Sequence, residues 1–148
     1  MIDGGGISIW CPQFYAFTPQ SELTAAGYTG MEAKGGTVDV VDCVVTGTGA
    51  FTELPDPSKL SGSGWVDTGD GIYLEANYDW STKITISGEN TKITGTEEKT
   101  LAVRMYPEGR DNASIEISGG TFSSDVSAFL KSGFRINNTD EGYVVVAN

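Results

Sequence analysis

The chain of 148 residues contains no histidine, only nine lysine and arginine residues together, and only two cysteines. Without histidine it cannot form the Ser-His or Cys-His pairs of common nucleophilic enzymes, or the histidine-rich sites that bind zinc. Nine cations against 20 acidic residues give a net charge of −11. A surface of this sign repels phosphate backbones and anionic lipid, so we expect no nucleic-acid partner.

Long apolar runs are also missing, because no stretch approaches the roughly 18 residues that a membrane-spanning helix needs. We therefore expect no membrane insertion. The first ten residues, MIDGGGISIW, lack the basic and apolar regions of a secretory signal. Because the chain starts on glycines and passes at once into a strand-like segment, we expect a fragment of a longer exported protein. The alternative is a cytosolic protein.

The two cysteines, Cys11 and Cys43, do not fix the redox compartment. Their separation is close to one repeat of the pattern described below, which would bring them together in adjacent repeats. A disulfide and two free thiols both remain open.

What the sequence does contain is glycine, serine and threonine, arranged as short alternating segments between turns. There are 20 glycines, and turn residues recur every few positions. Alternation of apolar and polar residues predicts half-buried strands. The predicted strand segments are 7–9, 38–40, 44–45, 72–74, 84–86, 92–93, 101–105, 115–117 and 143–146.

Helix signals are few. Residues 123–133 place Val126, Phe129 and Leu130 on one face and end at Gly133, which predicts one short helix. Residues 21–27 are a weaker candidate. The segment 51–70, FTELPDPSKLSGSGWVDTGD, is rich in proline and glycine and is predicted to be a looped-out surface insertion.

The predicted strands repeat. Ile84-Thr-Ile-Ser-Gly88 recurs as Ile115-Glu-Ile-Ser-Gly119, an offset of 31 positions. Further equivalences are 72–74 with 101–103, 45–48 with 93–96, and 38–40 with 84–86.

A regular repeat that contains two or three short strands predicts a parallel β-solenoid with one repeat in each turn. The rest of each turn then supplies the crossover connection that parallel strands require. Ile84 over Ile115 would then belong to an inner aliphatic ladder. We expect a single all-β domain over residues 1–148. The alternative is an antiparallel β-sandwich, for which Asp70-Gly71 is the best hairpin turn.

Residues 115–130, IEISGGTFSSDVSAFL, followed by Gly133-Phe134 and the strand 142–146, resemble a terminal motif, xIxISGGTFSxDVSxYL, of large cell-surface proteins of gut Firmicutes. The segments 67–77 and 84–88 are similar to the repeats that precede that motif. The resemblance implies a right-handed parallel β-helix, related in shape to pectate-lyase-like folds, within an exported adhesin-like protein. The family motif usually has tyrosine where this chain has Phe129.

The repeat stops after Gly120, and residues 121–146 are expected to form a C-terminal cap. The cap would prevent exposure of the last aliphatic layer and of unpaired strand edges. The side chains expected to cover the core are Phe122, Val126, Phe129, Leu130 and Phe134.

Because the expected fold is related in shape to pectate-lyase-like folds, an alternative hypothesis is an enzyme, either a polysaccharide lyase or a glycoside hydrolase. A lyase would need a base such as Lys83 or Arg104, near Glu75 or Asp79. A hydrolase would need paired carboxylates, for example Asp39 with Asp42, or Glu75 with Glu116. Ordinary solvated strand positions explain the same residues, and the negative net charge disfavours an acidic sugar, so we lean towards a non-catalytic protein.

Two binding sites are candidates. Asp67 and Asp70 lie three positions apart in a glycine-rich turn and could hold Ca²⁺, although the other acidic positions of a full calcium loop are missing. The aromatic residues Trp65, Tyr73, Tyr78 and Trp80 surround the predicted insertion and could stack on a host surface glycan. The alternative for these rings is packing of the insertion against the solenoid.

A second aromatic group near the N-terminus, at positions 10, 14, 15 and 17, is expected to cover that end of the core or to support self-association. The sequence therefore predicts a structural and adhesive module of an extracellular or cell-surface protein, with a carbohydrate partner.

Overall fold

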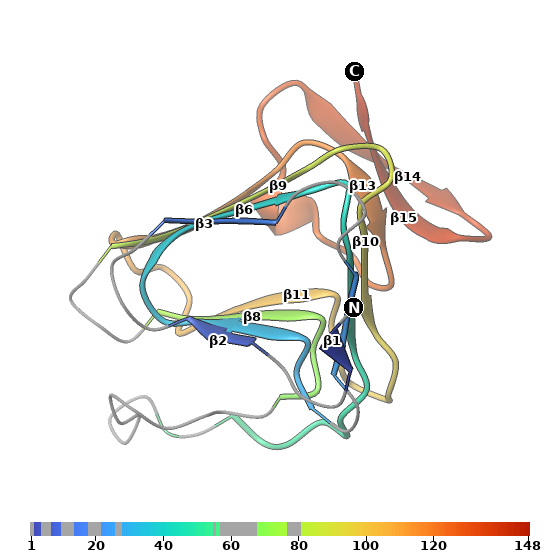
Figure 1. Ribbon diagram of the computed structural model, residues 1–148. Coiled ribbons are helices and arrows are strands. Elements are labelled where there is room, and N and C mark those ends of the chain that lie inside the picture. The colour runs from blue at the N-terminus through green and yellow to red at the C-terminus, as the bar shows by residue number, and fades with distance from the viewer. Residues whose placement is uncertain are drawn as a thin grey trace.

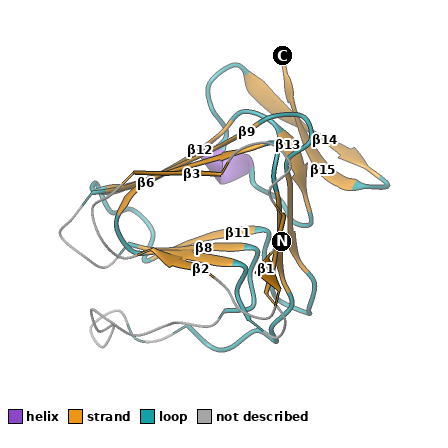
Figure 2. Ribbon diagram, in the orientation of Figure 1, coloured by secondary structure: helices purple, strands orange, loops and turns teal. Residues whose placement is uncertain are grey.

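The computed structural model describes residues 2–3, 7–9, 14–17, 22–25, 28–54, 56, 68–76 and 81–148, and the first four ranges are described as strand backbones only. The described chain is all-β, as the sequence predicts, and its strands form three sheets (Figure 1, Figure 2). No helix in the described part is long and apolar enough to cross a membrane.

The sheets are labelled A, B and C. Sheet A contains, in spatial order, β1 (Ile2–Asp3), β4 (Glu22–Ala25), β7 (Val44–Gly47), β10 (Lys92–Gly95), β13 (Gly120–Phe122), β15 (Gly142–Ala147) and β14 (Phe134–Thr139). Sheet B contains β11 (Val103–Tyr106), β8 (Ile72–Glu75), β5 (Met31–Ala33) and β2 (Ile7–Ile9). Sheet C contains β12 (Ala113–Ile117), β9 (Thr82–Ser87), β6 (Gly36–Val41) and β3 (Phe14–Phe17).

The chain visits the sheets in a fixed order, A then B then C, from β1 to β13, and one such pass is called a circuit here. Every described strand pair within the circuits is parallel. In Figure 1 sheets B and C lie opposite each other and sheet A closes one side between them. Among the described strands, antiparallel pairing occurs only where β15 contacts β13 and β14.

The register stacks like residues over like residues. Ile84 pairs with Ile115, and Val38 pairs with Ile84, as the sequence repeat predicts. The predicted equivalence of Val45 and Ile93 is also confirmed. The predicted equivalence of 72–74 with 101–103 is wrong by two positions, because Ile72 pairs with Val103.

These paired positions form the core. Val40, Ile86 and Ile117 belong to three successive circuits, pair in register and are each 0% exposed. Burying one such aliphatic side chain stabilises a fold by about 1.5–3 kcal/mol. The inner ladders therefore hold the sheets together.

Glycine occupies the corners between sheets C and A. Gly88 follows β9 with φ +93°, and a Cβ there would lie 2.2 Å from Asp42 Oδ1 in the circuit below. The same Oδ1 accepts a hydrogen bond from the Asn90 N–H at 3.1 Å. Ser118 and Gly119 form the next corner, between β12 and β13. This glycine-rich sequence is thus a structural turn.

The predicted insertion at 51–70 falls between β7 and β8, and only residues 51–54, 56 and 68–70 of it are described. The chain returns to the circuit at a fixed point, because Thr29 Oγ1 accepts hydrogen bonds from the N–H groups of Thr68 at 2.9 Å and Gly69 at 3.0 Å. Met31 then pairs with Ile72, so parallel register continues in sheet B across this segment.

The C-terminal segment leaves the circuits later than predicted. Phe122 still pairs with Ile93 in sheet A, and Val126 is 0% exposed. The predicted helix is only one 3₁₀ turn, η2 (Ser127–Phe129). It ends there because Leu130 has an extended backbone and forms a parallel bridge with Ile117. Phe129, Leu130 and Phe134 pack against the core while partly exposed.

The weak helix candidate at 21–27 is wrong, because β4 pairs with β7 and sheet pairing overrides a weak local preference. Cys43 is buried, and its Sγ lies 3.0 Å from the Val41 carbonyl oxygen. Cys11 lies outside the described residues.

Candidate functional site

The outer face of sheet B carries charged side chains that are buried. Met31 and Ala33 on β5, and Ile72 and Leu74 on β8, belong to the core. Strand alternation therefore directs the intervening side chains away from the core. The four of them that lie near one another, named the buried polar face here, are Glu32, Lys34, Tyr73 and Glu75, and each is 0–1% exposed.

Lys34 links two circuits on this face. Its Nζ lies 3.3 Å from Glu32 Oε1 on the same circuit and 3.0 Å from Glu75 Oε2 on the next. Among the described side chains, two carboxylates and one ammonium group meet here without solvent contact. Such an arrangement is retained only if the opposite charges stay close, because an uncompensated buried charge is costly.

A second ion pair continues along the same sheet. Asp70, which precedes β8, accepts hydrogen bonds at Oδ2 from Arg104 Nε at 2.5 Å and at Oδ1 from Arg104 Nη2 at 3.1 Å. Asp70 Oδ1 also accepts from the Leu101 N–H at 2.6 Å. The Arg104 guanidinium carbon lies 5.0 Å from the centre of the Phe51 ring, which fits a cation–π contact. The first part of the 51–70 segment therefore packs onto sheet B.

Tyr73 lies between these two ion pairs. It pairs in register with Glu32 on one side and Arg104 on the other. Its hydroxyl is buried and has no hydrogen-bond partner among the described residues. Burial raises the pKa of the Tyr73 phenol well above its usual value, and the negative charges of Glu75 and Glu32 add to the rise. Ionisation of Tyr73 is therefore disfavoured in the folded protein.

Of the four predicted glycan-binding residues, the structure describes only Tyr73. Tyr73 does point away from the core, as the alternation predicts, but an exposed ring at this position is wrong because the side chain is 0% exposed. A buried ring cannot stack on a sugar at the surface. Trp65, Tyr78 and Trp80 lie outside the described residues, and their role stays a prediction.

Of the two predicted calcium ligands, Asp67 and Asp70, the structure describes only Asp70. Asp67 lies outside the described residues. The Asp70 carboxylate is already matched by the Arg104 guanidinium, which supplies the positive charge that Ca²⁺ would otherwise bring. Within the described residues, no group of three or more acidic, cysteine or histidine side chains could hold a metal ion.

The candidate bases do not converge. Lys83 is exposed on β9 in sheet C, whereas Arg104 lies on β11 in sheet B and is held by Asp70. Glu75 and Glu116 likewise belong to different sheets.

The remaining carboxylates that the sequence singled out make structural contacts. Asp39 accepts a hydrogen bond from the Thr85 hydroxyl in the next circuit. Asp42 holds the corner at Asn90. Glu116 pairs with Lys131 at 3.3 Å near the C-terminal cap. Each of these carboxylates has a neighbour that explains it without a substrate.

Comparison of the chain with protein-family models, curated proteins and solved structures found no match.

The first prediction concerns Lys34. In Lys34→Ala, Glu32 and Glu75 each lose a buried ion pair, so we expect the free energy of unfolding to fall by about 3–5 kcal/mol in urea denaturation. The matched control is Lys131→Ala, because Lys131 is 51% exposed and its pair with Glu116 should contribute about 1 kcal/mol or less. Equal losses in the two variants would contradict a stabilising role for the buried ammonium.

The second prediction concerns Tyr73. The unfolded chain releases this proton near the ordinary pKa of 10.0, whereas the folded protein holds it to higher pH. Ionisation therefore favours the unfolded state, and stability falls as the pH rises through about 10. Tyr73→Phe should reduce that loss, measured as unfolding free energy between pH 8 and 11 (roughly the range around the usual tyrosine pKa). Tyr28→Phe, at an exposed tyrosine, should keep the wild-type pH dependence. If Tyr73→Phe keeps it too, the buried phenol is not responsible.

Proposed function

We propose that the chain is a right-handed parallel β-helix that serves as a non-catalytic structural and adhesive module of a bacterial cell-surface protein. The observation that carries the proposal is the repeated A-B-C order of parallel, in-register strands from β1 to β13. An antiparallel sandwich would instead pair neighbouring strands through hairpins. Right-handedness is supported by the strong preference of parallel crossover connections for that hand.

The C-terminal sequence supports a surface-protein origin through its resemblance to the terminal motif of gut Firmicutes surface proteins. In that motif the repeat gives way to a final strand, and here β15 and β14 form an antiparallel hairpin that extends sheet A beyond β13. Antiparallel strands with a different sequence pattern end the stacking of circuits, as a terminal cap should.

The non-catalytic part of the proposal is supported by the ion pairs that the charged side chains of sheet B already form. Asp70 with Arg104, and Glu32 and Glu75 with Lys34, join neighbouring circuits of sheet B. A general base or a paired-carboxylate site needs groups that converge on one open point. Lys83 and Arg104, and likewise Glu75 and Glu116, are divided between sheets B and C, and Asp39 and Asp42 contact Thr85 and Asn90.

The adhesive part of the proposal places glycan binding on a lateral face beside the 51–70 segment. Trp65, Tyr78 and Trp80 remain the candidate stacking residues, and Phe51 shows that this segment packs near sheet B. A negatively charged protein of this kind suits a neutral or basic glycan better than an acidic one.

The third prediction tests this function on a glycan array. The wild-type protein should bind a small set of glycans, and the double variant Trp65→Ala/Trp80→Ala should lose at least about tenfold in affinity, a loss of roughly 1.4 kcal/mol. Tyr28→Ala removes an exposed tyrosine and serves as the matched control, with unchanged binding expected.

Two results would count against the proposal. Glycan binding that is absent, or equal in the wild type and the double variant, would remove the adhesive site. Release of unsaturated or reducing sugar from a polysaccharide by the wild type would contradict the non-catalytic assignment.

A further inference from the structure

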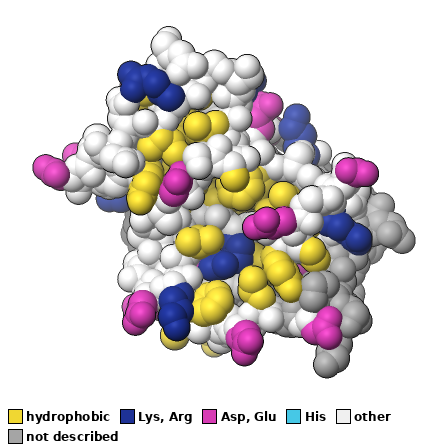
Figure 3. Space-filling model, turned by 180° about the vertical axis from the view of Figure 1, so that it is seen from behind, with side chains coloured by type: hydrophobic (Ala, Val, Ile, Leu, Met, Phe, Trp, Pro, Cys, Tyr) yellow, Lys and Arg dark blue, Asp and Glu magenta, His cyan; other side chains and the backbone are white. Residues whose placement is uncertain are grey.

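The three sheets end differently at the C-terminal end of the molecule. Sheet A continues past the last circuit with β15 and β14, whereas sheet B ends at β11 and sheet C ends at β12 apart from the bridge between Ile117 and Leu130. The hairpin therefore extends one sheet only. Figure 3 shows the side opposite to that of Figure 1, on which hydrophobic side chains gather across the middle with charged groups among and around them.

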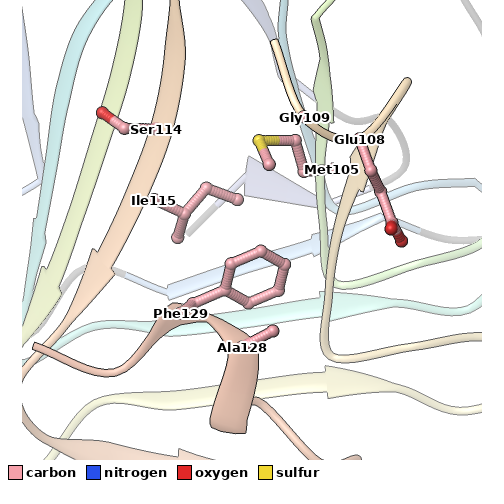
Figure 4. Close-up of a pocket in the computed structure, with 7 residues that line it drawn as sticks. All are labelled: Met105, Glu108, Gly109, Ser114, Ile115, Ala128 and Phe129. Atoms are coloured by element: carbon pink, nitrogen blue, oxygen red, sulfur yellow. The ribbon is translucent and has the colours of Figure 1, made fainter. Parts of the chain in front are cut away.

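A pocket of about 320 Å³ lies at this end, between sheets B and C. Met105 from β11, Ile115 from β12 and Phe129 from η2 line it, and Figure 4 shows these three side chains converging. Ala128, Glu108, Gly109 and Ser114 complete the lining.

The pocket continues the inner ladders. In sheet B, Ala33, Leu74 and Met105 are stacked in register through β5, β8 and β11. In sheet C, Val38, Ile84 and Ile115 are stacked in the same way. One further circuit would place an inward side chain above Met105 in sheet B and another above Ile115 in sheet C. The pocket occupies this space. An aliphatic side chain there would extend an existing stack.

The backbone of β11 offers hydrogen bonds beside the pocket. Carbonyl oxygens of Ala102 and Tyr106 accept hydrogen bonds from the N–H groups of Ile72 and Ala76 in the circuit below. Because successive backbone groups of a strand alternate in direction, those of Met105 point the other way. In the described part of the chain no strand pairs with β11 on that side. An extended segment could therefore pair with Met105 as an added strand.

The negative charge at the pocket favours a peptide segment that carries a basic residue. Glu108 is exposed at the pocket, and neither lysine nor arginine lines it. A cation next to the inserted aliphatic residue would meet this carboxylate, and the net charge of −11 would attract it from a distance.

We propose that the end of sheet B is a docking site for an extended, basic peptide segment of another protein. The segment adds a strand beside β11, inserts an aliphatic side chain above Met105 and places a lysine or arginine near Glu108. This is the β-augmentation mode of peptide recognition, in which main-chain hydrogen bonds give affinity and a side-chain pocket gives specificity. This proposal goes beyond the glycan binding proposed above, because it assigns a peptide ligand.

The fourth prediction uses the acetylated and amidated peptide Lys-Thr-Leu-Thr-Lys, whose symmetric charges suit either strand direction. We expect binding by the full chain with a Kd between roughly 10 μM and 1 mM in isothermal titration calorimetry. The charge-reversed peptide Glu-Thr-Leu-Thr-Glu should bind at least about tenfold more weakly, and so should a peptide methylated on the backbone nitrogens of both the leucine and the threonine after it. The leucine N–H pairs with Met105 in an antiparallel added strand, and the N–H of that threonine does so in a parallel one. The first comparison tests the charge, and the second tests the added strand.

Protein variants locate the site. Ala128→Trp, at an exposed lining residue, should fill the pocket and abolish binding, whereas Ser132→Trp, at an exposed position that does not line it, should leave binding unchanged. Glu108→Gln should weaken binding about two- to fivefold, less at high salt. Circular dichroism checks that the variants are folded.

Some outcomes would overturn the proposal. One is no heat of binding for the wild type at peptide concentrations of about 1 mM. Another is equal affinity for the basic, acidic and methylated peptides. A third is binding that Ala128→Trp leaves intact. Concentration-dependent dimerisation of the wild type in sedimentation experiments, lost in Ala128→Trp, would show that a second copy occupies the site in place of another protein.

Discussion

The stacking of inward aliphatic side chains at equivalent positions of successive circuits is the interaction on which the rest of the structure depends. Val40, Ile86 and Ile117 form one such stack in sheet C, and each is fully buried. Because the side-chain period of a strand is two, a slip of one residue would move the whole stack into solvent. The inner stacks therefore fix the register that brings Lys34 to Glu75 and Arg104 to Asp70 on the outer face of sheet B.

Much of this stacking could be predicted from the sequence, because it depends on local alternation and on a repeat. Ile84 and Ile115 share the motif Ile-x-Ile-Ser-Gly, and they pair as that motif indicates. The same reasoning misplaced Leu101 opposite Ile72, because apolar residues at 101 and 103 fit the pattern equally well. Only the pairing itself selects Val103. The short helix predicted at 123–133 is one turn for a similar reason, since the bridge from Leu130 to Ile117 ends it.

The buried polar face was missed because its burial is not a local property. Tyr73 alternates outward, which predicts exposure unless another segment covers the sheet. The sequence did hold one signal. Lys34 and Glu75 occupy equivalent positions, one after Ala33 and the other after Leu74, and Ala33 pairs with Leu74. Opposite charges at equivalent positions of adjacent circuits indicate a cross-circuit ion pair, but the strand at 31–33 had first to be aligned with the one at 72–74.

Methyl–methyl nuclear Overhauser effects in a protein labelled at isoleucine and valine methyl groups test this stacking most directly. Strands in adjacent circuits lie about 4.8 Å apart, well within the range of the effect. The account predicts cross-peaks from Ile86 to both Val40 and Ile117, and from Ile84 to both Val38 and Ile115. Cross-peaks that instead join Ile84 to Ile117 and Ile86 to Ile115, as a reversed strand direction would give, would contradict the parallel stacking on which the proposed β-helix rests.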